Sequence, residues 1–159
     1  MIISFGTLVV IFYQTNLLSQ QTDLLRWEQH VSVMPYLEFE VVRLSDNWME
    51  LKILNTGLGP AQIKKATIHS DKGDLDMDLS HFFLQNFTNP PTYTVNYLNP
   101  GSMLMAGAKM ALLGTSSENE PFNQFINNMG DEKFSYSIIY SSLYGDEWIW
   151  NSIKAVPVE

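Results

Sequence analysis

The chain has 159 residues, with 9 Lys and Arg against 17 Asp and Glu, a formal net charge of −8 at pH 7 and no cysteine. Nucleic-acid binding needs basic side chains to neutralise phosphates, so this acidic balance argues against nucleic acid as a partner. The absence of cysteine excludes disulfides, thiolate chemistry and cysteine-based zinc sites. Nothing else in the sequence indicates a cofactor.

The first element is an uncharged apolar stretch at residues 1–18, and no charged side chain occurs before Asp23. Spanning a bilayer takes about 20 apolar residues, so the stretch is at the short limit. A cleaved signal peptide would need a basic start and a small-residue cleavage site, and neither is present. We therefore predict a single-pass membrane anchor in contact with lipid. A buried or oligomer-packed helix and a processed signal are the alternatives.

The helix is expected to continue past the membrane surface, because residues 7–34 contain neither Gly nor Pro and Pro35 then breaks it. Leu17, Leu24 and Val31 recur at intervals of seven, which places them on one helical face, and Leu18 and Leu25 repeat one position later. Two interpretations remain open. Either this stripe packs on the chain's own domain, or it pairs with a second copy or with another membrane subunit's helix.

The remainder of the chain alternates apolar and polar side chains in short runs between turn residues, which is typical of β-strands. In the first run Leu37, Phe39 and Val41 are expected to face inward. The expected strands are residues 36–43, 48–55, 62–70, 92–98, 103–105, 109–113, 134–141 and 147–153, and the expected short helices are 79–87 and 120–129. We predict a mainly β chain: a transmembrane and stalk helix at 1–33, then an antiparallel immunoglobulin-like β-sandwich at 34–159 with one or two short inserted helices.

Four sequence runs carry a resemblance to known proteins. They are Y-Q-T-N-L-L at 13–18, M-P-Y-L at 34–37, N-T-G-L-G-P-A at 55–61 and Y-S-S-L-Y-G-D-E-W at 140–148. The third run is similar to a turn of immunoglobulin-like adhesion and accessory domains. Together the four resemble an uncharacterised group of small bacterial single-pass membrane-anchored proteins with an immunoglobulin-like β-sandwich domain. The resemblance covers most of the chain and implies this architecture, and it implies no activity.

An acidic cluster of Asp71, Asp74, Asp76 and Asp78 surrounds Gly73. Hard cations such as Ca²⁺ bind several carboxylates on a bent loop, and Gly73 could supply the bend. The spacing does not match an EF-hand, so a solvated acidic turn is expected, with a weak cation site as the alternative.

The run His69-Ser70-Asp71 contains the three residue types of a hydrolase triad. Neighbours on a strand point to opposite faces of the sheet, so adjacency argues against a triad here. No nucleophile-elbow sequence is present either. We predict that the protein is not an enzyme.

Aromatic side chains are concentrated near the C-terminus, at Tyr136, Tyr140, Tyr144, Trp148 and Trp150. Alternation along the strands is expected to place most of them in the core. Tyr144 and Trp148 flank the turn at Gly145 and are expected to form an exposed pair for partner binding.

These observations predict a non-enzymatic, membrane-anchored accessory or binding subunit that presents its β-sandwich to a protein partner. The expected partner-binding residues are Leu17, Leu24 and Val31 on the helix and Tyr144 and Trp148 on the domain. The alternative is a pilin-like filament or surface-structure subunit, although pilin-like helices carry an early acidic residue and Asp23 is the first here. The positive charges near the span are the N-terminal amine on one side and Arg26 on the other, and the domain is expected to be slightly more often extracytoplasmic.

Overall fold

The chain divides into two compact units, Met1–Val33 and Met34–Glu159, in a computed structural model. The structure describes residues 2–45, 47–86, 94–116, 118–129 and 134–152, with the backbone alone for residues 2–5. The ends of three expected elements, at Phe87, Thr92 and Ile153, lie outside these described residues.

The first unit is one long helix, α1 (Ile2–Ser32). Its polar side chains return to the helix backbone: the Thr15 hydroxyl donates to the Ile11 carbonyl at 2.9 Å and the Thr22 hydroxyl to the Leu18 carbonyl at 2.8 Å. In the described part of the chain, no helix combines the length and the apolar character needed to cross a membrane.

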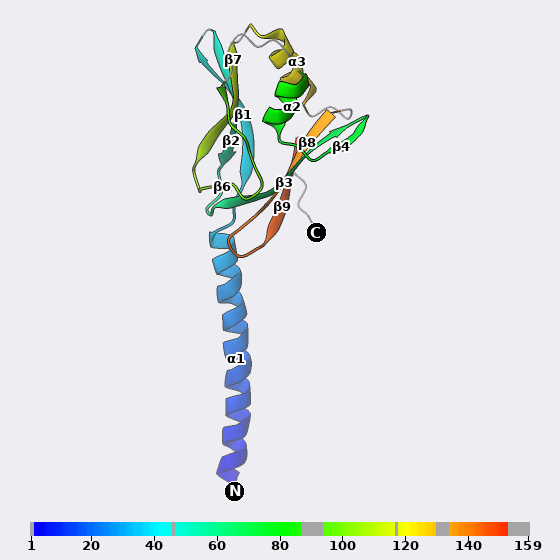
Figure 1. Cartoon of the computed structure of the whole chain (residues 1–159). Coiled ribbons are helices and arrows are strands. Elements are labelled where there is room, and N and C mark those ends of the chain that lie inside the picture. Colours follow the sequence, from blue (N-terminus) through cyan, green and yellow to red (C-terminus); the bar gives the residue numbers. More distant parts are fainter. Residues whose placement is uncertain (1, 46, 87–93, 117, 130–133, 153–159) are drawn as a thin grey trace. The chain divides into compact units, whose positions relative to one another are not determined.

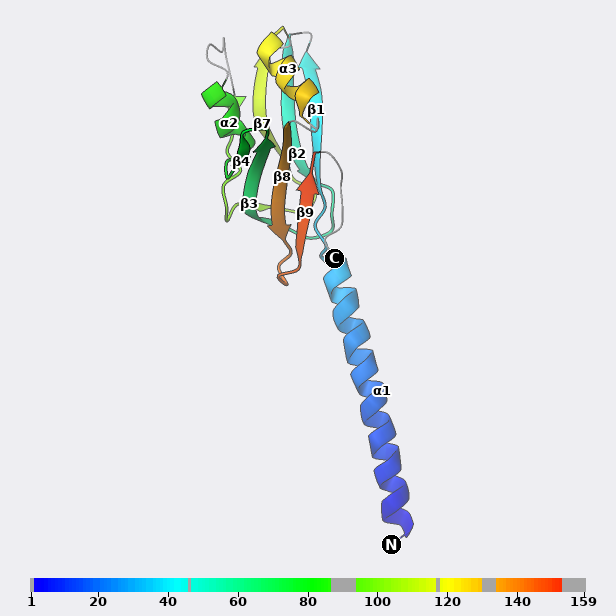
Figure 2. The same ribbon diagram turned by 90° about the vertical axis from the view of Figure 1, so that its right-hand side faces the viewer.

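The second unit contains two antiparallel sheets. The first has the strand order β1-β2-β7-β5, and the second has the order β4-β3-β8-β9 with β6 also paired to β3. The strands are β1 (Leu37–Ser45), β2 (Trp48–Asn55), β3 (Ala61–Ser70), β4 (Gly73–Leu75), β5 (Thr94–Val95), β6 (Met103–Leu104), β7 (Lys109–Ser116), β8 (Phe134–Ser141) and β9 (Glu147–Asn151). Figure 2 shows β3, β8 and β9 side by side in front of β7, β2 and β1.

One hydrophobic core joins the two sheets. It contains Leu51 and Ile53 from β2 together with Ile68 from β3, all buried. The Phe39 ring on β1 reaches the opposite sheet, where it lies 4.3 Å from the Trp150 ring and 5.9 Å from the Tyr136 ring. The predictions of a mainly β chain with antiparallel sheets and a helix at the N-terminus are confirmed.

Two short helices, α2 (Leu79–Asn86) and α3 (Glu120–Asn128), lie side by side (Figure 1). The Asn119 side chain caps α3 by accepting a hydrogen bond from the Phe122 nitrogen at 3.1 Å. Aromatic rings join the helices to each other and to β8; the cluster consists of Phe82, Phe83, Phe122, Phe125 and Phe134. Both inserted helices were predicted, because their apolar residues recur at helical spacing.

Three details of the predicted strands are wrong. Residues of strand β4 were expected to form a turn. The strand has only three residues, including Gly73 and Asp74, and so shows no alternation of apolar and polar side chains. Strand β5 has two residues among the described part of the expected 92–98 run. Val41, expected to face inward, is 44% exposed, since β1 is at the edge of its sheet and has a strand neighbour on one side only.

Candidate functional site

The helix α1 carries a run of exposed apolar side chains. Six consecutive apolar or aromatic side chains, from Leu8 to Tyr13, are each more than half exposed. Because a helical turn takes 3.6 residues, six in succession surround the helix completely. Such a segment presents apolar side chains in every direction and has no polar face.

The predicted helix contacts are also exposed, with Leu17 at 42%, Leu24 at 62% and Val31 at 43%. Leu18, Leu25 and Trp27 are exposed on the same outer half of α1. These residues therefore form an accessible stripe within the first unit, as their spacing suggested.

In the second unit, the N-T-G-L-G-P-A run fastens the segment where the domain begins. The Asn55 side chain is buried and makes four hydrogen bonds. Its amide nitrogen donates to the carbonyls of Gly59 at 2.8 Å and Leu104 at 2.9 Å. Its oxygen accepts from the nitrogens of Tyr36 and Gly57, both at 3.1 Å. One side chain thus satisfies two donors and two acceptors from four places in the chain.

The rest of this run binds the same segment through its backbone. The nitrogens of Leu58 and Gly59 donate to the Met34 carbonyl at 2.9 and 3.4 Å. A Cβ on Gly57 would lie 2.5 Å from that carbonyl oxygen and closer still to the Tyr36 nitrogen, so only glycine fits. The motif that carried the resemblance is therefore structural, and it fixes where β1 starts.

Three exposed turns gather at the same end of the domain, which we call the Met34 end. They carry Leu58, Met105 and Tyr144, of which Tyr144 is 53% exposed. Gln62, at the start of β3, pairs with Met103 on one side and Ser141 on the other, so the turns beside those strands are neighbours. Tyr144 is therefore placed as predicted, on an accessible turn.

Trp148 is not placed as an exposed partner of Tyr144. It is half-buried against the core, and its ring stacks on Tyr140 at a centroid distance of 6.0 Å. The physical reason is register: Trp148 lies directly opposite Tyr140 in the β8–β9 pair, so both side chains lie on the core face. The expectation of an exposed pair is wrong for this residue.

The four aspartates of the acidic cluster separate into different roles. Asp71 is exposed, Asp74 pairs with His69 at 2.8 Å, and Asp76 pairs with Lys65 Nζ at 2.7 Å. Asp78 Oδ2 accepts from the Ser80 nitrogen at 3.1 Å and so caps α2. Among the described residues, no group of three or more potential ligands could hold a metal ion.

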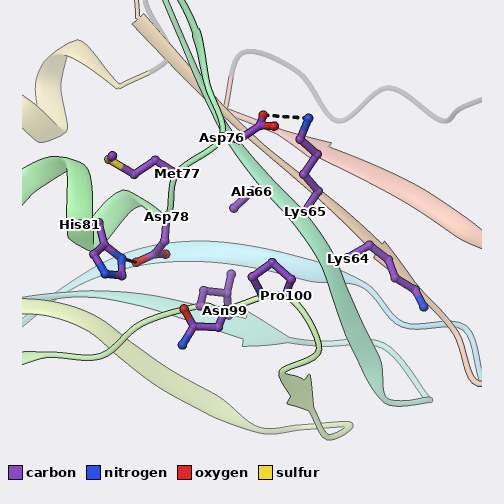
Figure 3. A pocket seen from close by; sticks show the side chains of 10 residues that line it. Lys64, Lys65, Ala66, Asp76, Met77, Asp78, His81, Asn99 and Pro100 are labelled. Atoms are coloured by element: carbon purple, nitrogen blue, oxygen red, sulfur yellow. Dashed lines mark ion pairs between the residues drawn. The ribbon is translucent and has the colours of Figure 1, made fainter.

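An open groove of about 630 Å³ lies between β3, the segment that leads into α2 and the segment before β6 (Figure 3). Lys65 and Asp76 form an ion pair on one side of it. Asp78 lies deeper, next to His81, whose Nδ1 is 3.6 Å from Asp78 Oδ2. The complete lining is Lys64, Lys65, Ala66, Asp76, Met77, Asp78, His81, Leu98, Asn99 and Pro100.

The charges in this groove are largely matched within the protein. The Lys65 ammonium lowers the pKa of Asp76, whereas burial raises the pKa of Asp78. Burial and the nearby Asp78 charge raise the pKa of Tyr136 far above its ordinary value. The Tyr136 hydroxyl and Asp78 Oδ1 are both buried, and neither makes a well-formed hydrogen bond. The groove therefore holds one exposed ion pair, Lys65 with Asp76, whereas Lys64 donates to the neutral side chain of Gln62 at 2.8 Å.

A serine, a histidine and an aspartate do meet on the outer face of the second sheet. His69 Nδ1 is 2.8 Å from Asp74 Oδ1, and His69 Nε2 is 2.8 Å from Ser137 Oγ. Sequence reasoning considered only Ser70 and Asp71 as neighbours of His69. It missed the contacts with Ser137 and Asp74, because the three residues come from β3, β8 and β4. Ser137 is buried in the middle of a sheet, where backbone N–H groups are directed at neighbouring strands rather than at an oxyanion position.

No family model matches this sequence, and no curated protein matches it. Among solved structures, the chain is similar to the archaellum periplasmic stator protein FlaG from Sulfolobus acidocaldarius. The identity is 15% and the TM-score is 0.24, over 74% of this chain and 99% of that chain. A TM-score this low assigns neither a fold nor a function.

Proposed function

We propose that this protein is a non-enzymatic, membrane-anchored accessory or binding subunit. Residues 1–18 hold it in lipid as a single-pass anchor, the rest of α1 forms a stalk, and the β domain is presented to a protein partner. The observation that carries the proposal is the complete ring of exposed apolar side chains from Leu8 to Tyr13.

The free energy of hydration explains why this ring matters. Removing one large apolar side chain from water contributes about 1.5–3 kcal/mol, so six such residues left in water would be strongly unfavourable. Lipid removes all of them from water at once, whatever direction they face. The hydroxyls of Thr15 and Thr22 are bonded to the helix backbone, which lowers the cost of placing them in or near lipid.

The β domain supplies the presenting surface in this proposal. We assign it to the immunoglobulin-like sandwiches, and its two antiparallel sheets with a shared core support that assignment. Leu58, Met105 and Tyr144 at the Met34 end are among its exposed apolar side chains, and Tyr144 is the domain residue we assign to partner contact.

Membrane fractionation followed by purification in a mild detergent tests the proposal. The full chain should sediment with membranes, resist extraction by high salt and carbonate, and be recovered with a partner in fixed stoichiometry. Replacing Val9 and Ile11 by Asp should release the chain into the soluble fraction, because a charge at the centre of a span costs about 3 kcal/mol. A monodisperse monomer without any partner would reject the accessory role.

The side of the membrane is the next point to test, and we propose the extracytoplasmic side. The chain has no cysteine, so Lys72→Cys on an exposed turn would supply a unique thiol. An impermeant thiol reagent should label this variant in intact cells as well as after lysis. Labelling only after lysis would place the domain in the cytoplasm. The unchanged chain is the blank.

The contacts of His69 with Ser137 and Asp74 allow a direct test of the proposal that the protein is not an enzyme. A fluorophosphonate probe reacts with activated serine hydroxyls, so it should leave the purified full chain unlabelled. Covalent labelling that disappears in Ser137→Ala and persists in Ser70→Ala would show an activated nucleophile and overturn this part of the proposal.

A surface-structure subunit is the second candidate, since helices bundled in a filament would also cover the apolar ring of α1. Electron microscopy of cells that overproduce the full chain separates the two. Filaments that disappear when Val9 and Ile11 are replaced by Asp would favour this candidate. Their absence, together with membrane sedimentation, would favour the anchored subunit.

A further inference from the structure

A regular apolar seam runs along α1 from the proposed anchor into the stalk. Reading Leu17 as position a of a seven-residue repeat places apolar residues at nearly every a and d position. We call these residues the α1 seam: Val10, Tyr13, Leu17, Leu24, Trp27 and Val31, with Gln20 at the one polar d position. All seven side chains are exposed, so the seam is accessible within the first unit.

The neighbouring leucines do not define a competing seam. If Leu18 were at position a, the d positions would be occupied by Gln14, Gln21 and Glu28. If Leu18 were at position d, the a positions would be polar as well, because the residues three places before Leu18 and Leu25 are Thr15 and Thr22. Only the first register provides the alternating a and d side chains that interlock with a partner helix.

The charges beside the seam determine which partner fits. Asp23 is at position g and Glu28 at position e, the two positions that flank a and d. In a parallel pair of helices, a residue at g faces the residue at e five positions later on the other helix. Two copies of this chain would therefore place Asp23 of each against Glu28 of the other, which repels twice. Arg26, at position c, is directed away from the seam.

We propose that the α1 seam binds a parallel helix of a different protein, with apolar residues at a and d and Lys or Arg at the positions facing Asp23 and Glu28. This inference rests on the proposed function. Two helices run parallel when this chain and its partner are each anchored in the same membrane at the N-terminus. It narrows the unidentified partner to one chemistry, a basic-flanked apolar helix. It also explains how the acidic flanks disfavour a second copy of the same chain.

The full chain can test this proposal without the natural partner being known. Asp23→Lys turns both repulsive contacts of a parallel pair into attractive ones, so this variant should dimerise at least about tenfold more tightly than the unchanged chain. The matched control is Thr22→Lys with Gln29→Lys, which adds the same charge on the outer face at position f. Sedimentation equilibrium in density-matched detergent measures all three.

A second comparison tests the register. In the Asp23→Lys background, Leu24→Ala should abolish the gain, whereas Leu25→Ala, which removes the same atoms from the adjacent position, should leave it unchanged. A stable dimer of the unchanged chain, or equal dimerisation of Asp23→Lys and its control, would overturn the proposal. A failure of the proposed membrane anchor would give a different result from a failure of the proposed helix pairing. Asp23→Lys would still dimerise, but the chain would be absent from the membrane fraction.

Discussion

The two units differ in how far they bury the same type of side chain. Leu24 on α1 is 62% exposed, whereas Leu51 on β2 is 1% exposed. On the helix, the Thr15 hydroxyl bonds to a carbonyl four residues earlier, whereas the domain relies on distant contacts, such as the hydrogen bond from Asn55 to Leu104. The difference teaches that the domain completes its own core, whereas the apolar side chains of the helix stay exposed within the first unit.

A pair of glycine substitutions should show the largest contrast between the units. Gly57→Ala forces a Cβ against the backbone of Met34 and Tyr36, so we expect it to destabilise the domain by about 4 kcal/mol or more. Gly6→Ala meets nothing within 4 Å and should raise helix content slightly, because alanine is the better helix former. Thermal unfolding followed by tryptophan fluorescence measures the first and far-ultraviolet circular dichroism the second. A folded Gly57→Ala domain of unchanged stability would contradict this account of the motif.

Leucine truncation gives the next largest effect. Leu51→Ala should lower the free energy of unfolding of the domain by about 3 kcal/mol, through lost burial and the cavity left behind. Leu24→Ala removes the same atoms from an exposed position and should change domain stability by less than about 0.5 kcal/mol. Urea unfolding of both variants makes the comparison. Similar losses would show that α1 is stabilised together with the domain.

A smaller contrast is expected between two buried serines. The Ser80 hydroxyl donates to the carbonyls of Asn96 at 2.8 Å and Leu112 at 3.2 Å, so Ser80→Ala should cost about 1 kcal/mol. The Ser141 hydroxyl is buried without a hydrogen-bond partner, and Ser141→Ala should leave stability unchanged or raise it. Chemical denaturation at one pH resolves the pair. The reverse order of stabilities would contradict these hydrogen-bond assignments.

The smallest effect concerns the charge of Asp78. Burial raises its pKa above the ordinary value of 3.8, so the folded state binds the proton more tightly than the unfolded state. Its contribution is therefore favourable at low pH and is lost as the pH rises from 3.8 through the raised pKa. Asp78→Asn keeps an acceptor for the helix cap and cannot titrate. The variant should accordingly gain stability over the unchanged protein as the pH rises.

Asp76 provides the opposite control for that experiment. Its pKa is lowered by the hydrogen bond from Lys65, so its favourable contribution is present above 3.8 and is lost as the pH falls. Asp76→Asn should therefore lose stability relative to the unchanged protein as the pH rises. Parallel stability profiles for the unchanged protein and both variants would contradict the two pKa directions.

Features governed by local periodicity could be predicted from the sequence. Strand β2 was predicted with its observed bounds because apolar and polar residues alternate from Met49 to Ile53. Helix α3 was also predicted close to its observed bounds, since its apolar residues recur at helical spacing. The exposed stripe of Leu17, Leu24 and Val31 could be located from the seven-residue spacing alone.

Features that depend on distant pairing could not be predicted. The four hydrogen bonds of Asn55 include one to a residue 49 positions away, and no local pattern records that contact. The His69 contacts depend on Ser137, which is 68 positions away. The error at Trp148 arose because proximity to a turn was weighted above the strand alternation that places it opposite Tyr140.

The fastening of the Met34 segment has a mechanical consequence. Tension on residues 1–33 would reach the β domain first at Met34, whose carbonyl accepts two hydrogen bonds, and next at Tyr36, whose nitrogen is bound by Asn55. The pairing of β1 with β2 begins one residue later, where Leu37 lies opposite Asn55. A pull through the N-terminal segment would therefore meet these hydrogen bonds before it met the β1–β2 pairing.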